Sequence, residues 1–183
     1  MRIDGSGGPI HIVTLCTGNA ARSVMAGVML VQLAEHEGVE VVVTTAGTHA
    51  VEGQPMSGRT RSAIESIGQL DTSGIVRHRS HQLSVADCRA ADVIVAMEAD
   101  HVRYVRRNHA EAAVKTATIR RLVGDLDAEG EPLVRLLETL GLEEVDLELD
   151  VDVIDPAGGE QPEYDACAAE LWALCQSFVM LLG

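Results

Sequence analysis

Short runs of apolar, largely β-branched residues alternate with longer stretches of helical composition along most of the chain. Such runs, when bounded by turn residues, are typical of strands that are buried on both faces of a sheet. Strands that alternate with helices predict βαβ units, which place the strands parallel and the helices on both faces of the sheet. The expected strands are residues 10–15, 39–45, 92–97 and 114–119, and the expected helices are residues 23–38, 58–68, 85–91, 100–111 and 163–182.

The length and composition of the chain indicate one globular domain. The chain has 183 residues, of which 46% are hydrophobic and only 2% aromatic, so the core must consist mainly of aliphatic side chains and methionine. Residues 1–9 are expected to be a flexible lead-in, and residues 10–183 a single domain. Within it, the acidic stretch at about residues 124–150 is interpreted as a solvated insertion; a surface for a substrate or partner is the alternative.

Charge and cysteine usage limit the possible partners and compartments. The formal net charge of -14 disfavours nucleic acid and anionic membranes, because both repel an acidic surface. The chain has neither a signal-peptide pattern nor an apolar run long enough to span a membrane, so we predict a cytoplasmic protein. The four cysteines show no metal-ligand spacing and are expected to be free thiols: Cys16, Cys88, Cys167 and Cys175. Helical spacing places Cys167 and Cys175 in the core.

The segment CTGNAARS joins the first expected strand to the first expected helix. A strand, a tight turn and a helix N-terminus form an anion cradle, because backbone N–H groups converge there and the helix dipole adds positive potential. Gly18 is expected to permit the turn, and Asn19 to adopt a left-handed backbone. The guanidinium of Arg22 can donate two hydrogen bonds to a phosphoryl group. The expected phosphate-binding loop is Thr17, Gly18, Asn19, Ala20, Ala21, Arg22 and Ser23.

Cys16 ends the expected strand and faces the same cradle. A helix N-terminus and a nearby cation favour the thiolate of a cysteine, which is its nucleophilic form. Ser23 can donate a hydrogen bond to this sulfur and stabilise it as a leaving group. The pattern therefore predicts attack on phosphorus by Cys16 and a cysteinyl-phosphate intermediate. The structural alternative, a buried core cysteine, is disfavoured by the neighbouring Asn19, Arg22 and Ser23.

The spacing Cys-x5-Arg-Ser, with Gly-Asn inside it, resembles the active-site loop of the low-molecular-weight protein tyrosine phosphatase family. Further segments resemble that family in the same order: TTAGTHA (44–50), RHRSHQLS (77–84), DVIVAMEADH (92–101) and VIDPAGG (153–159). The resemblance implies a three-layer, flavodoxin-like α/β fold with a four-stranded parallel sheet in the order 2-1-3-4. It also implies a protein tyrosine phosphatase that hydrolyses phosphate monoesters, phosphotyrosine in proteins above all, with no cofactor and no metal.

The chemistry also needs a proton donor, because an alkoxide or phenoxide must be expelled, and the same carboxylate can later activate water. The resemblance assigns this role to Asp155, which precedes Pro156 at the end of an acidic run. It assigns His78 to brace the loop through Asn19, and Thr45 to a hydroxyl position in the same network. Each supporting residue has the alternative of being an ordinary polar residue with satisfied hydrogen bonds.

Several residues depart from the family's pattern. Ala21 stands where many members carry a second cysteine, so a reversible disulfide with the nucleophile is not expected there. Ala157 and Val51 stand where aromatic residues are common, so an aromatic substrate loses stacking contacts. His81 replaces an arginine, and Glu98 replaces an aspartate. These departures weaken the expectation of phosphotyrosine specificity.

Two other functions remain open. Arsenate reductases of the related fold use the same loop but need further cysteines; only Cys88 is nearby, and the Asp155-Pro156 pair favours hydrolysis. A non-catalytic module that binds phosphate or a phosphoprotein is disfavoured because Cys16, Arg22 and Asp155 occur together, whereas binding needs only the loop. We expect the substrate to be a phosphorylated protein or a small phosphomonoester. Phosphate, sulfate and vanadate are the expected active-site anions, and the protein is expected to be a monomer or weak dimer.

Overall fold

A computed structural model describes residues 8–73, 75–125, 133–147 and 152–183. The expected lead-in lies outside the described residues except for Gly8 and Pro9, and so do parts of the expected acidic insertion. Four parallel strands form one sheet in the order β2-β1-β3-β4. The strands are β1 (Ile10–Cys16), β2 (Val41–Gly47), β3 (Val93–Ala96) and β4 (Thr116–Thr118). The predicted fold class and strand order are therefore confirmed.

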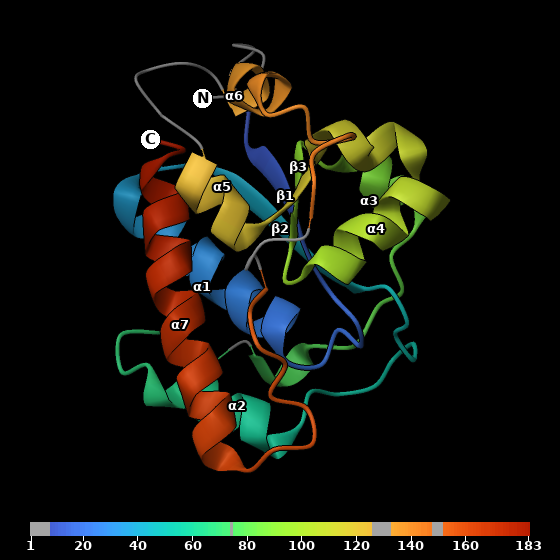
Figure 1. Cartoon of the computed structure of the whole chain (residues 1–183). Coiled ribbons are helices and arrows are strands. Elements are labelled where there is room, and N and C mark those ends of the chain that lie inside the picture. Colours follow the sequence, from blue (N-terminus) through green and yellow to red (C-terminus); the bar gives the residue numbers. More distant parts are fainter. Residues whose placement is uncertain (1–7, 74, 126–132, 148–151) are drawn as a thin grey trace.

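Helices lie on both sides of the sheet (Figure 1). One side carries α1 (Arg22–Glu37), α2 (Gly58–Ser66), α5 (Ile119–Asp125) and α7 (Gln161–Met180). The other side carries α3 (Val85–Ala90), α4 (Ala99–Asn108) and the 3-10 helix η2 (Ala110–Lys115), and the remaining short helices are η1 (Ile75–Arg77) and α6 (Leu133–Thr139). The result is the three-layer arrangement that the alternation of strands and helices predicted.

Strand β1 is buried because each of its faces packs against a different layer of helices. Ile10, Ile12 and Cys16 belong to the core cluster that includes side chains of α1 and α7, whereas Val13 and Leu15 belong to the cluster that includes side chains of α3 and α4. Successive side chains of a strand point to opposite faces, which explains this division. A continuous apolar run is therefore what a central strand of such a sheet requires.

Helix α1 begins immediately after the loop that follows β1. It ends at Gly38, whose φ of 72° is left-handed and whose N–H caps the helix by donating to carbonyls of the last turn. The first turn of α1 therefore lies at the carboxyl end of β1. Because β2 and β3 flank β1 on opposite sides, this end is the point where the strand order reverses, which is where open α/β sheets bind ligands.

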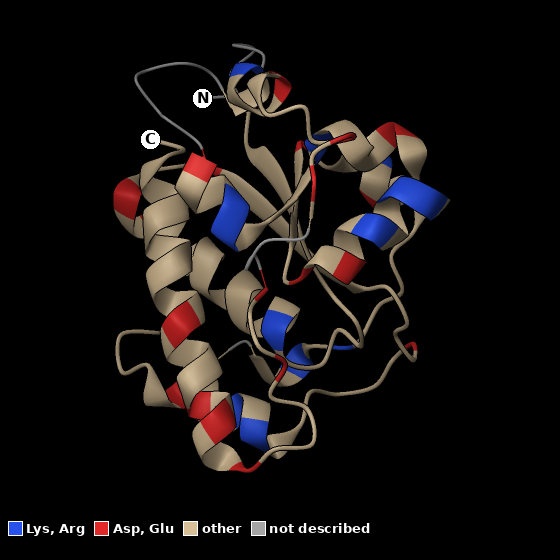
Figure 2. Ribbon diagram, viewed as in Figure 1, with Lys and Arg blue, Asp and Glu red and all other residues tan. Residues whose placement is uncertain are grey.

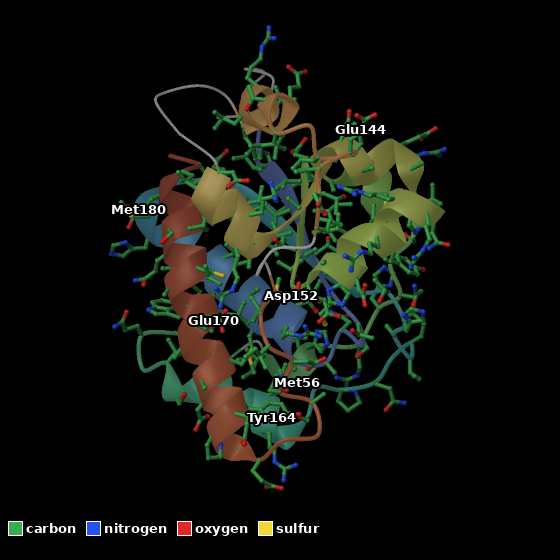
Figure 3. The ribbon with its side chains drawn as sticks, viewed as in Figure 1. Met56, Glu144, Asp152, Tyr164, Glu170 and Met180 are labelled. Carbon is green, nitrogen blue, oxygen red and sulfur yellow. The ribbon has the colours of Figure 1, made fainter. Side chains whose placement is uncertain are left out.

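The C-terminal helix α7 packs against α1, α2 and α5. Met56, just before α2, and Tyr164, in the first turn of α7, both belong to the core where these helices meet (Figure 3). Cys167 and Cys175 are buried in the same cluster, so their prediction as core thiols is confirmed. Burial raises the pKa of the Cys167 thiol to about 12, which keeps it protonated and unreactive at neutral pH.

The described part of the expected acidic insertion is partly helical and contributes to the core, whereas its residues Glu138, Glu143 and Glu144 are exposed. Leu133, Leu136 and Leu137 of α6 are buried in the main core, because their spacing forms an apolar stripe along one face of the helix. Helix α6 lies near the amino ends of the strands, at the end of the sheet opposite the loop after β1 (Figure 1). The end of the described insertion nevertheless reaches the segment before Asp155, because Leu147 clusters with Ala99, whose N–H donates to Asp152.

Charged residues are distributed over most of the helices (Figure 2). Helix α7 carries acidic residues and no lysine or arginine, whereas α4 carries three arginines beside one aspartate. Among the described residues, the three arginines of α4 are accompanied by Asp100, and one of them, Arg103, pairs with it. An anionic substrate must therefore be held by local groups. None of the helices in the described residues combines the length and the apolar character needed to cross a membrane.

Candidate active site

The loop after β1 turns at Asn19. Its φ of 50° makes it the one left-handed non-glycine residue among those the structure describes, as the sequence predicted. The buried Asn19 side chain donates from Nδ2 to Ser23 Oγ at 3.0 Å, and its Oδ1 accepts from the backbone N–H of His81 at 2.8 Å. Gly18 is not left-handed, and a Cβ added there would have no protein atom within 4 Å. The turn therefore does not depend on the missing side chain of Gly18, contrary to the role that we expected for this residue.

The glycine that this loop does require is Gly47, at the end of β2, which the sequence analysis missed. A Cβ at Gly47 would lie 2.6 Å from the carbonyl oxygen of Thr17 and 2.9 Å from the backbone nitrogen of Asn19. The next two residues bind the loop: the N–H of Thr48 donates to the Cys16 carbonyl at 2.9 Å, and the N–H of His49 donates to the Thr17 carbonyl at 2.8 Å. The end of β2 therefore supports the loop backbone directly.

The Cys16 sulfur is in hydrogen-bond contact with Ser23. Cys16 Sγ lies 3.0 Å from Ser23 Oγ, and both residues are buried. Because Asn19 Nδ2 already donates to the Ser23 oxygen, the hydroxyl proton of Ser23 is free to point at the sulfur. Thr14 Oγ1 donates to the Ser23 carbonyl at 2.8 Å and anchors the start of α1 to β1. A donor placed in this way stabilises a thiolate.

His78 contacts the loop from the segment before α3. Its Nε2 lies 2.9 Å from the carbonyl oxygen of Asn19, which can only accept, so Nε2 carries the proton and donates. Burial lowers the pKa of His78, which favours this neutral form. Ser80 Oγ donates to the same carbonyl at 2.9 Å, a contact that the sequence analysis did not anticipate. The structure thus brings His78 to the loop through Asn19.

Thr45 does not reach the loop network that the resemblance implied for it. Its Cγ2 faces α1, where a Cβ on Gly27 would lie 2.6 Å from it. No hydrogen bond from its hydroxyl to the loop is found among the described residues. Instead, the hydroxyl of Thr14 on the neighbouring strand binds the backbone at Ser23. Thr45 therefore packs against α1 at Gly27, and its expected role in the network is corrected.

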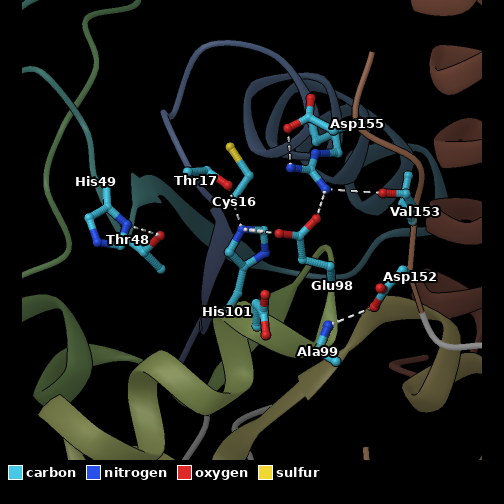
Figure 4. Close-up of polar contacts among 12 residues, drawn as sticks. Cys16, Thr17, Thr48, His49, Glu98, Ala99, His101, Asp152, Val153 and Asp155 are labelled. Atoms are coloured by element: carbon cyan, nitrogen blue, oxygen red, sulfur yellow. Dashed lines mark hydrogen bonds and ion pairs between the residues drawn. The ribbon is translucent and has the colours of Figure 1, made fainter. Parts of the chain in front are cut away.

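The guanidinium of Arg22 is buried between two carboxylates (Figure 4). Nη1 donates to Glu98 Oε2 at 2.5 Å and to the Val153 carbonyl at 3.0 Å, and Nη2 donates to Asp155 Oδ2 at 2.5 Å. Burial by itself would lower the pKa of Arg22, but the hydrogen bond to Glu98 and the charge of Asp155 raise it above its usual value. Arg22 therefore remains cationic, and Asp155 lies next to the loop as predicted.

The segment that contains Asp155 is attached to the turn between β3 and α4. The N–H of Val153 donates to the Met97 carbonyl at 2.8 Å, and Asp152 Oδ1 accepts from the N–H of Ala99 at 2.7 Å. Figure 3 shows Asp152 in the middle of the molecule, where this segment passes the start of α4. Asp152 is exposed to solvent. In the structure its carboxylate satisfies a backbone donor at the N-terminus of α4.

His101 is a further buried residue that the sequence analysis did not single out. Its Nε2 lies 3.0 Å from Thr17 Oγ1 and 3.3 Å from Glu98 Oε1, and only 2% of the residue is exposed. Burial, and next the positive charge of Arg22, lower the pKa of His101 to about 3, so the imidazole is neutral at physiological pH. No pattern in the sequence distinguishes His101 from an ordinary helix residue of α4.

The rim of the site has aromatic groups, but not at the positions where the family commonly carries them. Val51 is 65% exposed, and Ala157 is also on the surface. The ring of His49, which follows the loop-supporting end of β2, packs edge-on against Tyr104 of α4 with centroids 5.5 Å apart. The backbone N–H of His49 donates to the Thr17 carbonyl, and this hydrogen bond keeps the two rings beside the loop.

The site therefore combines a sulfur in contact with a hydroxyl, a buried guanidinium and a half-exposed carboxylate. Such a set can bind a tetrahedral oxyanion, attack its central atom and exchange a proton with a leaving group. In the part of the chain that the structure describes, no three His, Cys, Asp or Glu side chains are grouped in a way that holds a metal ion.

Comparisons with known proteins agree with this site. A model of the family described as "Low molecular weight phosphotyrosine protein phosphatase" matches residues 11–132, which include Cys16 and Arg22 and end before Asp155. A protein-arginine-phosphatase of Geobacillus stearothermophilus is 29% identical over 166 residues, which cover 91% of each chain.

Two further proteins are similar to this chain. Low molecular weight protein-tyrosine phosphatase A of Mycobacterium tuberculosis is 34% identical over 110 residues, which cover 57% of this chain and 63% of that one. The crystal structure of a low molecular weight protein tyrosine phosphatase from T. tengcongensis superimposes with a TM-score of 0.75 and 27% identity, covering 93% of this chain and 98% of that one.

Proposed function

The chain belongs to the low molecular weight phosphotyrosine protein phosphatase family, and on that premise we propose that it dephosphorylates protein side chains through a cysteinyl-phosphate on Cys16. Membership makes the protein a phosphatase; the residue roles and the substrate are what we add. The observation that carries the proposal is the 2.5 Å hydrogen bond from Arg22 to Asp155. It supports the proposal because it brings a residue that can bind phosphate and a residue that can donate a proton to the same cysteine.

In the first proposed step, the phosphoryl oxygens accept hydrogen bonds from the loop N–H groups and from Arg22. The Cys16 thiolate attacks phosphorus, the S–P bond forms and the bond from phosphorus to the leaving group breaks. Protonated Asp155 gives its proton to the leaving atom, so a tyrosine side chain departs as the neutral phenol and an arginine side chain as the guanidinium cation. The contact between Cys16 and Ser23, in the first turn of α1, supports this arrangement. The N-terminus of a helix favours the anionic form of both sulfur and phosphate.

In the second proposed step, the Asp155 carboxylate accepts a proton from a water molecule whose oxygen attacks phosphorus. The S–P bond breaks, inorganic phosphate is released, and the sulfur leaves as a thiolate. The hydroxyl of Ser23, 3.0 Å from the sulfur, is positioned to donate to this thiolate as it departs. Asp155 ends the cycle protonated, ready for the next substrate.

Phosphotyrosine in proteins is the first proposed substrate, because it names the family. Phosphoarginine in proteins is the second, and two observations favour it. The relative that covers 91% of this chain is named for arginine. In addition, Val51 and Ala157 leave no aromatic wall at the usual rim positions, whereas the half-exposed carboxyl group of Asp155 beside the loop suits a cationic guanidinium leaving group. A guanidinium needs no ring stacking.

Arsenate reduction is not favoured by the environment of the other thiols. Burial raises the pKa of Cys88 to about 11, and this residue of α3 belongs to the core cluster on the far face of the sheet from α1. A thiol that is protonated and buried is a poor resolving nucleophile.

The proposed function is tested by release of p-nitrophenol from p-nitrophenyl phosphate in EDTA. We expect turnover by the parent protein, its abolition in Cys16→Ser and a strong reduction in Asp155→Ala. Asp165→Ala, which changes a carboxylate on α7 that pairs with Gln161, is the matched control and should be unaffected. Phosphotyrosine and phosphoarginine peptides of the same sequence then compare the two substrates. A parent protein that binds phosphate but does not turn over would leave a binding module as the better description.

A further inference from the structure

A buried array of side chains connects Arg22 to the loop residue beside the nucleophile. Glu98 accepts from Arg22 through Oε2, and its Oε1 lies 3.3 Å from His101 Nε2, which itself lies 3.0 Å from Thr17 Oγ1 (Figure 4). We propose that Glu98 and His101 are positioning residues that hold Arg22 with its open N–H edge toward the phosphoryl group, a role that rests on the proposed function.

The hydrogen bonds of Arg22 leave one edge of its guanidinium open. Nη1 donates to both Glu98 Oε2 and the Val153 carbonyl, and Nη2 donates to Asp155 Oδ2. Among the described residues, no acceptor is found for Nε–H or for the second proton of Nη2. Nε and Nη2 form one edge of the planar guanidinium, and two parallel donors on such an edge match two phosphoryl oxygens. Glu98 binds the guanidinium at Nη1, away from this edge.

Glu98 is available for this role because it does not cap its own helix. It occupies the position before the first residue of α4 with an extended backbone, and its side chain makes no capping hydrogen bond. A side chain at this position ordinarily accepts from the first N–H groups of the helix. Here Asp152 accepts from the N–H of Ala99 instead. The Glu98 carboxylate therefore lies between Arg22 and His101.

The chemistry of His101 indicates which way its hydrogen bonds run. A carboxylate accepts only, so the single proton of the neutral imidazole is on Nε2, where it serves Glu98 and Thr17. Nδ1 is then an acceptor that is buried without a partner among the described residues. Burying an unsatisfied acceptor costs free energy that leucine would avoid at this place. The donor at Nε2 explains why a histidine stands there.

Positioning matters most when Asp155 leaves Arg22 to protonate the leaving group. Glu98 and the Val153 carbonyl are then the protein partners that remain on the guanidinium. Negative charge on the phosphoryl oxygens is best stabilised by donors that are already aligned, and aligned donors count for more in the transition state than in the bound substrate. If Glu98 no longer aligns the Arg22 guanidinium, kcat should therefore fall more than the affinity for phosphate does.

The test compares four variants with p-nitrophenyl phosphate, and inorganic phosphate is the inhibitor. In Glu98→Gln we expect kcat to fall about 10- to 100-fold, as a small misplacement of a reacting group can cause. Phosphate should bind at least as tightly, because a negative charge near the anion is removed. His101→Leu should show a similar fall in kcat, and His101→Gln should recover most of it because its amide retains a donor.

Asp100→Ala is the matched control. Its carboxylate lies between Glu98 and His101 in sequence but is 77% exposed and pairs with Arg103. We expect its kcat to equal that of the parent protein. A parent-like kcat in Glu98→Gln, or a His101→Gln variant no better than His101→Leu, would overturn the positioning role. A parallel loss of kcat, phosphate affinity and melting temperature in both variants would also overturn it and indicate a purely structural role.

A measurement without turnover separates this role from the proposed function. In ¹⁵N-labelled protein with saturating inorganic phosphate, the Nε–H signal of Arg22, assigned by its absence in Arg22→Lys, should exchange slowly with solvent. It should remain so in Asp100→Ala and broaden or disappear in Glu98→Gln and His101→Leu. If the parent protein has no phosphatase activity, this signal still decides whether Glu98 and His101 hold Arg22. An unchanged signal in both variants contradicts the inference.

Discussion

Nη2 of Arg22 donates to Oδ2 of Asp155 at 2.5 Å, although the two residues are 133 positions apart in the chain. The same carboxylate must protonate the leaving group in the proposed first step. Without substrate, Asp155 is therefore bound to the same guanidinium that is expected to bind the phosphoryl group. A dianionic phosphoryl group must displace this carboxylate from Arg22, which brings Asp155 toward the leaving atom.

Replacement of Asp155 by asparagine separates its proton transfer from its contact with Arg22. The amide oxygen can still accept from Arg22, but the amide cannot donate or accept the catalytic proton. We expect kcat for a phosphotyrosine peptide to fall by about 10² to 10⁴, the usual contribution of a general acid. The fall for p-nitrophenyl phosphate should be smaller, because p-nitrophenolate leaves without full protonation. Steady-state kinetics on both substrates check this, and equal losses would argue against a role as acid.

Gly47→Ala tests the support that β2 gives to the loop. The new Cβ would lie 2.6 Å from the Thr17 carbonyl and 2.9 Å from the Asn19 nitrogen, so the loop must shift. We expect loss of both turnover and phosphate binding, and a stability decrease of about 1–3 kcal/mol in urea unfolding. Gly58→Ala, where an added Cβ meets no atom within 4 Å, is the control and should keep full activity. Normal phosphate binding by Gly47→Ala would show that the loop tolerates the displacement.

Alkylation with iodoacetate at neutral pH should modify Cys16 alone. Burial raises the pKa of Cys88 to about 11 and that of Cys167 to about 12, and it raises the pKa of Cys175 as well. A protonated thiol reacts slowly, so these three cysteines are protected. Mass spectrometry should find one added carboxymethyl group, its rate matching the loss of activity. Inorganic phosphate should slow the reaction. Modification of another cysteine at the same rate would contradict the expected reactivity.

The stability of the protein should decrease in acid in part because of His101. Its folded-state pKa of about 3 lies below the ordinary value of 6.5, so only the unfolded chain binds a proton as the pH falls from about 6.5 toward 3. Stability from this group is therefore full above pH 6.5 and declines by up to about 1.4 kcal/mol per pH unit below it.

His101→Gln, which cannot titrate, measures this contribution. Between pH 7 and pH 5, the free energy of unfolding in urea should fall by about 2 kcal/mol more in the parent protein than in the variant. His78, whose pKa burial also lowers, acts in the same direction in both proteins and cancels in the comparison. Equal pH dependence in the two proteins would show that folding does not lower the pKa of His101.

The features that were predictable from sequence are those that neighbouring residues decide. The parallel sheet followed from apolar runs that alternate with helical stretches, and β1 is indeed buried on both faces. The contiguous loop CTGNAARS gave the left-handed Asn19, the contact between Cys16 and Ser23 and the start of α1. Backbone preference and hydrogen bonding over a few residues are written in local sequence, so the cradle could be recognised before its geometry was known.

The tertiary structure alone decided which distant residues complete the site. Glu98 meets Arg22 across 76 positions, His101 meets Thr17 across 84, and Gly47 is required only because the loop backbone passes over it. Thr45 faces α1 rather than the loop for the same kind of reason. Contacts of this kind depend on how the layers pack and on the register between strands, and no short-range pattern of hydrophobicity or turn residues encodes them. The sequence by itself determined the fold and the cradle, whereas packing determined what holds the arginine in it.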